Sequence, residues 1–492
     1  MGDNKDELDI LNWNVRIDKI TNILNLLKMR DLTYYGKVVI IKVLVASQIV
    51  YTATAVRTPY NIIKTLNKLI YQFIWNSKKE KIKRNICINP ITDGGLGMID
   101  LDCKVRSLKL SWIHKYLNGP QSHWKLLFTY WMNKIGGTSS CFIYNCNLKD
   151  MSYICKKNKL PDFYTDLFCI WSSLKYVNVL KSKNISEQII WNNSNIRFQN
   201  EVLLYRKWQT AGIVKVKHVF KNGRWMDPVH LNSFVGNQQL MFNFEFAKIK
   251  KAFPSQWIHA LRNNNKRADD PKESSLIEIA TGDLIDVNTT NVKQYYSLLV
   301  GEKQIMPSII YSWEEVLQVQ TEIDWKAILL FKFGKIFDNK LKQFNFKILH
   351  KIIPSKANLC KWKLLIDDIC NVCNKRETTF HILLHCKNVT QFWSILTNLI
   401  YNLYKVRIKM NETKVIIGYD IKSSKFDMIN IIIIFGQYVI YKNYLRKCSE
   451  QVKINTRMLY NEFKSTLKTF IRRKLIQNIL SPLESTQILD IL

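Results

Sequence analysis

Four residues with metal-binding side chains lie close together in the last third of the chain. Cys370, Cys373, His381 and Cys386 follow the spacing C-x2-C-x7-H-x4-C. A CxxC turn directs two thiolates to one side, and a histidine and a cysteine further along can complete the tetrahedron that zinc prefers. Four protein ligands that leave no open position are typical of a structural site rather than a catalytic one. We therefore predict a structural zinc ion held by these four side chains.

Two alternatives to this ligand set remain at the level of the sequence. His385 stands next to Cys386 and could replace His381, although two adjacent ligands would bind one ion in an awkward geometry. The four residues could also be ordinary buried side chains. The other eight cysteines form no CxxC pair, and we interpret them as core or surface thiols: Cys87, Cys103, Cys141, Cys146, Cys155, Cys169, Cys360 and Cys448.

The location of the protein is indicated by its thiols and its first residues. Eleven cysteines are an odd number for a disulfide framework. The polar and acidic start, Met1 to Glu7, is unlike a signal peptide. We therefore expect reduced thiols and a cytoplasmic and nuclear location.

Charge indicates the kind of partner. The 492 residues include 73 Lys and Arg against 39 Asp and Glu, which gives a net charge of +34. Such a surplus repels itself in a compact state, so a polyanionic partner is expected, with nucleic acid first and an anionic membrane second. Three clusters are candidate nucleic-acid contacts, with a solvated surface as the alternative for each: Lys78, Lys79, Lys81, Lys83 and Arg84; Lys363, Lys375, Arg376 and Lys387 around the cysteines; and Arg472, Arg473 and Lys474.

Two tryptophans flank the cysteine–histidine cluster. Trp362 and Trp393 could stack on unpaired bases or serve as apolar anchors in the core. The core interpretation is favoured, because the helical segment before the cluster needs apolar anchors.

Apolar periodicity describes the elements that must position these residues. Spacings of three and four predict helices over 11–30, 61–75 and 102–117. Residues 36–56 are rich in β-branched residues, so a strand is possible locally, but the length without a turn favours a buried helix. Thr33 is placed to cap that helix. The most apolar run, 428–441, has fourteen residues, is too short to cross a bilayer and indicates a buried helix. We expect no transmembrane segment and no membrane partner.

The residues around the zinc ligands resemble the zinc-binding module of LINE-type (non-LTR) retrotransposon reverse transcriptase proteins. The resemblance is carried by Phe346-Lys347-Ile348-Leu349-His350, Ile353-Pro354-Ser355, Leu359, Trp362, Cys370, Cys373, Glu377-Thr378-Thr379-Phe380-His381, Cys386 and Phe392-Trp393. Upstream, the order of several short motifs is similar to the thumb-side region that follows the polymerase palm: Arg30-Asp31-Leu32-Thr33, Gly36-Lys37, Tyr51, Pro59, Phe73-Ile74-Trp75, Gly94-Gly95-Leu96 and Leu110-Ser111-Trp112-Ile113. Trp191-Asn192, Trp208, Gly212-Ile213 and Asn222-Gly223 resemble the segment between the two.

The apolar periodicity predicts a mainly α fold, and together with the polar run after residue 262 and the resemblance it divides the chain into five parts. These are a thumb-like helical bundle over 1–120, a mixed α+β middle region over 121–262, a polar linker over 263–275, a helical segment with the zinc knuckle over 276–395, and a helical C-terminal region over 396–492.

The carboxylates that a polymerase needs are not evident. The family's palm carries an aromatic residue two positions before an Asp-Asp pair, whose carboxylates hold two metal ions. The pairs here, Asp269-Asp270 and Asp367-Asp368, are preceded by Arg267 and Leu365 and lie downstream of the thumb-like region. We therefore expect the C-terminal portion of such a protein, without palm or endonuclease and without enzymatic activity alone.

The resemblance also implies the partners. The chain would bind template RNA and target DNA, beside a palm or endonuclease supplied upstream or in trans. The alternative is a truncated or host-adopted copy that acts as a protein-interaction or structural module.

Overall fold

The computed structural model describes residues 10–76, 79–136, 143, 151–174, 185–193, 195–263, 276–279, 283–318, 322–336, 338–421, 423–450, 455–472, 486 and 488–490. The chain forms two compact units, each built from segments that are distant in sequence. Unit 1 comprises Met1–Asp18, Ala46–Leu66 and Asp100–Lys303, and unit 2 comprises Lys19–Val45, Asn67–Ile99 and Gln304–Leu492. The five parts expected from the resemblance stay a prediction, and all of the linker after Asn263 lies outside the described residues.

Helices dominate unit 1, with short hairpins in its middle. Its helical elements are η1 (Ile10–Asn14), the start of α2 (Val15–Lys28), α4 (Ala46–Ala55), the start of α5 (Tyr60–Ile74), α7 (Leu101–Asn118), α8 (His123–Lys134), α10 (Met151–Lys157), α11 (Asp162–Leu174), η4 (Ile185–Glu187), α12 (Arg206–Thr210), η5 (Val216–His218), α13 (Pro228–Val235), α14 (Gln239–Ala252), α15 (Ser255–Asn263) and α16 (Val292–Gly301). The strands among its described residues form three antiparallel pairs: β1 (Arg197–Phe198) with β2 (Glu201–Val202), β3 (Phe220–Lys221) with β4 (Arg224–Trp225), and β5 (Leu276–Glu278) with β6 (Leu284–Asp286).

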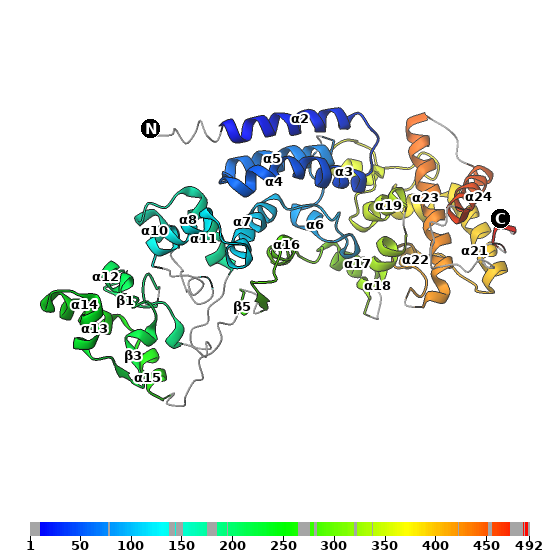
Figure 1. Cartoon of the computed structure of the whole chain (residues 1–492). Coiled ribbons are helices and arrows are strands. Elements are labelled where there is room, and N and C mark those ends of the chain that lie inside the picture. The colour runs from blue at the N-terminus through cyan, green and yellow to red at the C-terminus, as the bar shows by residue number, and fades with distance from the viewer. Residues whose placement is uncertain are drawn as a thin grey trace. The chain divides into compact units, whose positions relative to one another are not determined.

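Unit 2 is helical in all the elements that the structure assigns to it. After the remainders of α2 and α5 these are α3 (Tyr34–Ile40), η2 (Ile41–Val45), α6 (Arg84–Ile88), η3 (Ile91–Asp93), α17 (Ile309–Leu317), α18 (Trp325–Leu329), η6 (Leu330–Lys335), α19 (Asn339–Leu349), α20 (Lys356–Lys361), η7 (His381–His385), α21 (Lys387–Tyr404), α22 (Glu412–Ile416), η8 (Ser424–Phe426), α23 (Asp427–Glu450) and α24 (Thr456–Arg472). The long helix α23 packs against α19, α21 and α24 (Figure 1). The predicted mainly α fold is confirmed.

The segment over residues 36–56, for which the sequence allowed a strand or a helix, is helical as far as Ala55. The elements α3, η2 and α4 form one helical run from Tyr34 to Ala55, and Thr33 caps its start by accepting a hydrogen bond from the Gly36 amide at 3.1 Å. By length and composition this run could cross a membrane, a test that core helices of soluble proteins also pass. The expectation of no transmembrane segment therefore stays a prediction. The apolar run 428–441 lies in α23 and is largely buried, as expected.

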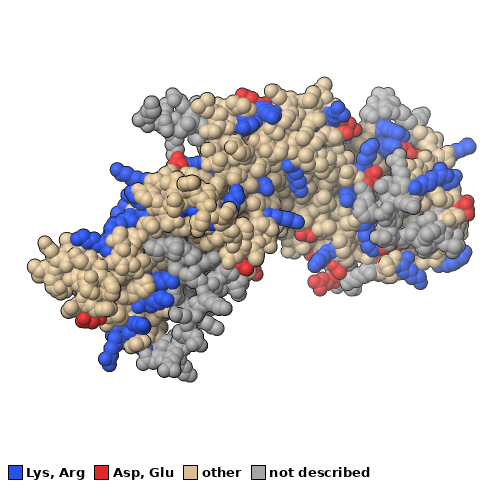
Figure 2. All heavy atoms as spheres, in the orientation of Figure 1, with Lys and Arg blue, Asp and Glu red and all other residues tan. Residues whose placement is uncertain are grey.

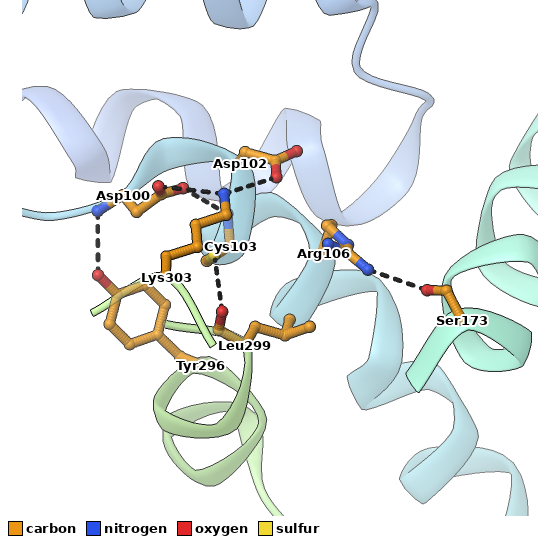
Figure 3. Close-up of polar contacts among 8 residues, drawn as sticks. All are labelled: Asp100, Asp102, Cys103, Arg106, Ser173, Tyr296, Leu299 and Lys303. Atoms are coloured by element: carbon orange, nitrogen blue, oxygen red, sulfur yellow. Dashed lines mark hydrogen bonds and ion pairs between the residues drawn. The ribbon is translucent and has the colours of Figure 1, made fainter. Parts of the chain in front are cut away.

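An ionic contact ties α16 to the start of α7 in unit 1. The Lys303 ammonium lies 3.2 Å from Asp100 and 3.1 Å from Asp102, and the Tyr296 hydroxyl accepts a hydrogen bond from the Asp100 amide (Figure 3). Cys103 lies beside these carboxylates, so the group has metal-binding side chains. Because the Lys303 ammonium already pairs with both carboxylates, we interpret this contact as structural.

Candidate metal centre

The first two ligands are positioned by a tight turn. The Cys370 amide donates to the Lys375 carbonyl at 2.8 Å, and the Asn374 amide donates back to the Cys370 carbonyl at 3.0 Å. Asn374 has φ 54°, the left-handed conformation that asparagine tolerates better than most residues. The chain therefore folds back on itself within six residues. This turn places Cys370 and Cys373 on the same side.

The other two ligands are brought together by a single π-helical turn. The helix η7 begins at His381, and the Cys386 amide donates to the His381 carbonyl at 2.9 Å. A hydrogen bond over five residues is the π-helical pattern, which is rare and often found at functional sites. The spacing H-x4-C spans this turn, so the two side chains lie close together. Cys386 is also the residue from which α21 starts.

The four side chains form a cluster of the size that zinc requires. Their ligand atoms all lie within 4.8 Å of one another. The Cys373 and Cys386 sulfurs are 3.6 Å apart. A tetrahedron with Zn–S bonds near 2.3 Å has sulfurs about 3.8 Å apart, so this separation fits a shared ion.

The histidine supports the same interpretation. Its Nε2 is buried and has no hydrogen-bond partner among the described residues. Burial lowers the pKa of His381, which favours the neutral ring that binds a metal. A buried polar atom without a partner is costly, and a metal ion would satisfy it. His385, in contrast, is exposed and lies 3.1 Å from the Glu412 carboxylate. The structure thus gathers His381, and not His385, with the cysteines.

The comparisons with known proteins agree with this geometry. Residues 308–393 match the family described as zinc-binding in reverse transcriptase, a range that contains all four ligands. The chain is also similar to the Transposon TX1 uncharacterized 149 kDa protein of Xenopus laevis, with 20% identity over 423 residues. The resemblance to LINE-type reverse transcriptase proteins is confirmed. The aligned region covers 78% of this chain but only 31% of that relative, so the chain spans less than a third of the relative's length.

The predicted zinc site is therefore confirmed as a zinc-binding module with a complete donor set. Zinc would be held by Cys370, Cys373, His381 and Cys386, and it would fix the two turns to each other. The amide of Lys387 donates to the Cys373 sulfur at 3.3 Å. Such a bond stabilises the thiolate that a metal needs, and the pKa of this cysteine is lowered although burial acts in the opposite direction.

The pairing of Glu377, a buried acid between the second and third ligands, was not predicted from the sequence. Glu377 accepts a hydrogen bond from the Tyr444 hydroxyl at 2.7 Å, and both residues are buried. This bond joins the segment between the CxxC turn and His381 to α23. Because the two residues are 67 positions apart, no local pattern in the sequence could have paired them.

The predicted basic contacts differ in their surroundings. Lys79, Lys83, Lys363, Lys375 and Lys387 are exposed, and among the described residues none of them forms an ion pair. Arg84 is bound by Glu80 at 2.5 Å and Arg376 by Asp368 at 2.6 Å, so their charges are partly neutralised. Arg472 is exposed at the end of α24. Lys78, Arg473 and Lys474 lie outside the described residues.

The two tryptophans have different environments. Trp393 is buried, and its indole N–H donates to the Leu383 carbonyl at 2.8 Å, so it is a core residue and is not placed to stack on a base. Trp362 is half-buried, and the Lys81 ammonium lies 4.3 Å from the centre of its ring. This contact brings the basic stretch around residue 81 next to the segment that leads into the zinc knuckle. Both belong to unit 2.

Proposed function

We propose that this chain binds template RNA and target DNA through a lysine-rich surface organised by the zinc module. The observation that carries the proposal is the contact between Lys81 and Trp362, which joins two basic segments that lie far apart in sequence. We call the exposed lysines of these two segments the basic surface: Lys79, Lys81, Lys83, Lys363, Lys375 and Lys387. Figure 2 shows that Lys and Arg side chains outnumber Asp and Glu on the visible face.

The physical basis is counterion release. Each lysine that contacts a phosphate displaces condensed cations, and this gives affinity without sequence preference. Lysines without an acidic partner lose no ion pair when they bind. Five of the six residues of the basic surface have no ion pair among the described residues, so they are available for phosphate contacts. Nucleic acid is also the partner expected from the similarity to reverse transcriptase proteins.

The first experiment is salt-titrated anisotropy with labelled structured RNA and duplex DNA, using the zinc-loaded full chain. The variant Lys79→Ala/Lys83→Ala/Lys363→Ala should bind more weakly. Three lost phosphate contacts should also flatten the slope of log K against log salt by about 2.7 on duplex DNA. The matched control changes three exposed lysines of the same unit outside the basic surface: Lys405, Lys409 and Lys425. Equal slopes for the two variants would refute the proposal.

The role of zinc is tested with a second variant. Cys370→Ser/Cys373→Ser removes two of the four ligands and should abolish stoichiometric zinc. We expect affinity to fall as well, because the turn that carries Lys375 loses its anchor. Unchanged binding by zinc-free protein would show that the surface forms without the metal.

We also propose that the chain alone does not polymerise DNA and that it acts in the cytoplasm and the nucleus. Of its two Asp-Asp pairs, Asp367 and Asp368 lie near Lys356 and Arg376, at 3.9 and 2.6 Å, so these carboxylates face cations of the chain itself. Asp269 and Asp270 lie outside the described residues. Primer extension on an RNA template should give no product, and imaging of a tagged chain tests the location.

A further inference from the structure

Three consecutive aliphatic residues project into solvent beside the zinc knuckle. Leu364, Leu365 and Ile366 are 67%, 43% and 104% exposed. They lie in the loop between α20 and Cys370, and we call them the apolar tip. Single exposed aliphatic residues are ordinary, but a contiguous group marks an interaction site more often than chance. The tip therefore needs a partner that can cover it.

Hydrogen bonds fix the loop at both ends. On the α20 side, the Leu364 amide donates to the Leu359 carbonyl at 2.9 Å, directly after Lys363 with φ 59°. On the knuckle side, the Ile369 amide donates to Asp367 at 3.0 Å, and the Ile369 carbonyl accepts from the Lys356 ammonium at 2.6 Å. The next residue is the zinc ligand Cys370. The tip is thus presented by a braced loop.

The charges around the tip favour a polyanion. The two carboxylates of the loop are matched within the protein, Asp367 by Lys356 and Asp368 by Arg376. Lys361 and Lys363, in contrast, are exposed and form no ion pair among the described residues. The tip is therefore an aliphatic group flanked by available cations.

We propose that the apolar tip is a wedge that enters a base step of a duplex nucleic acid while the flanking lysines contact the phosphates. The proposal rests on the nucleic-acid binding proposed above. Leucine and isoleucine side chains inserted between base pairs unstack them and kink the duplex, and the larger protein surface that the bent duplex then covers offsets the lost stacking. A wedge must be exposed and held in place, and the tip is exposed on a loop whose two ends are fixed by hydrogen bonds.

A lipid bilayer is less suited to the same tip. Three aliphatic side chains provide about a dozen carbon atoms, fewer than the single myristoyl chain that by itself gives only marginal membrane binding. A base step, in contrast, is narrow enough to be filled by one or two such side chains.

The test uses the full zinc-loaded chain and short DNA duplexes that carry 2-aminopurine beside a central mismatch, where unstacking costs least. The fluorescence of 2-aminopurine rises when the base unstacks, so the wild-type chain should increase it. The variant Leu364→Ser/Leu365→Ser/Ile366→Ser should lose that increase and keep its zinc content and its salt slope. The control Leu26→Ser/Met29→Ser/Val43→Ser changes three exposed apolar residues of the same unit and should behave like wild type.

The outcomes separate the two proposals. Wild-type binding without any rise in fluorescence, or a rise that the tip variant retains, would overturn the wedge and leave nucleic-acid binding in place. An absence of binding to any RNA or DNA would overturn both. Tip-dependent binding to phosphatidylserine vesicles, with no response from 2-aminopurine, would show that the tip enters a bilayer instead.

Discussion

Replacement of Lys332 by methionine should stabilise the protein, and the gain should depend on pH. Lys332 lies in η6 and is buried, and among the described residues its ammonium has one weak hydrogen bond, to the Val415 carbonyl at 3.5 Å. Burial lowers the pKa of this side chain to about 7 from 10.5. An ammonium in such a place must either lose its proton or remain charged without adequate solvation.

The size of the effect follows from the pKa. Each pKa unit corresponds to about 1.4 kcal/mol, so Lys332 costs about 5 kcal/mol of the free energy of unfolding at pH 7 and below. Between pH 7 and 10.5 the unfolded chain binds the extra proton, so wild-type stability rises with pH across this window. Above pH 10.5 the cost disappears. Loss of the weak hydrogen bond offsets about 1 kcal/mol or less of the gain.

The assay is urea unfolding of Lys332→Met and wild type at pH 7, 8.5 and 10, followed by tryptophan fluorescence. The variant should be more stable by about 3–5 kcal/mol at pH 7, and the difference should shrink towards zero at pH 10 and above. A matched control lies three residues away. Lys335 binds the buried Asp427 at 2.5 Å, so Lys335→Met should destabilise by about 1–3 kcal/mol at pH 7. A gain that is the same at every pH, or a loss at pH 7, would refute the assigned burial cost of Lys332.

Three further predictions concern a hydroxyl, a glycine and a pair of thiols. Tyr444→Phe removes the hydroxyl that donates to Glu377, so the free energy of unfolding should fall by about 1.5–3 kcal/mol in urea; an unchanged value would mean that water replaces the hydroxyl. Gly436→Ala should lower the free energy of unfolding by about 1–3 kcal/mol through overpacking, because the new Cβ would lie 2.7 Å from a leucine methyl group of α21. Thermal melting of the variant measures this loss, and an unchanged melting temperature would show that α21 and α23 can move apart to accept the methyl group. Cys169 should react with iodoacetamide before Cys155, because a hydrogen bond between the two thiols lowers the pKa of Cys169 and raises the pKa of Cys155. Peptide mass spectrometry after brief labelling measures the two reaction rates, and equal rates would contradict the prediction.

Helix positions were predictable because burial imposes a period on the sequence. The helix expected over 61–75 is observed at Tyr60–Ile74, and the one expected over 102–117 at Leu101–Asn118. The choice of helix for 36–56 was also right, although β-branched residues favour strands locally. The length of the run without a turn decided for the helix, because strands in globular proteins are usually no longer than about ten residues.

The zinc ligands were predictable from spacing, but the tertiary contacts around them were not. The CxxC turn is local, and so is the π-helical turn that joins His381 to Cys386. The pairing of Glu377 with Tyr444 depends on how α23 packs, whereas the burial of Trp393 was already favoured by the sequence. Local residue types determine a ligand set, whereas tertiary packing determines which neighbours surround it.

The net charge of +34 overstates the number of cations available to a partner, because several lysines are internal. Lys37 is buried and donates to the carbonyls of Phe73 and Ile74, the last residues of α5. Lys109 is buried and donates to the Val56 carbonyl just after α4 at 2.7 Å, and burial lowers its pKa to about 8. These ammonium groups satisfy helix C-termini, where carbonyls have no partner within the helix. A count of lysines along the sequence cannot separate such caps from surface charges.

The salt dependence of binding can distinguish the lysines that contact phosphate from those that are buried inside the protein. The slope of log K against log salt reports the number of phosphates neutralised and not the net charge. If the five lysines of the basic surface without ion pairs each contact one phosphate, the slope on duplex DNA should be about −4.5. A slope of that size, flattened by the basic-surface variant and not by its control, would place the interface at the zinc module. A slope steeper than about −10 would require many additional phosphate contacts, and the basic surface of unit 2 would then be only one part of a larger interface.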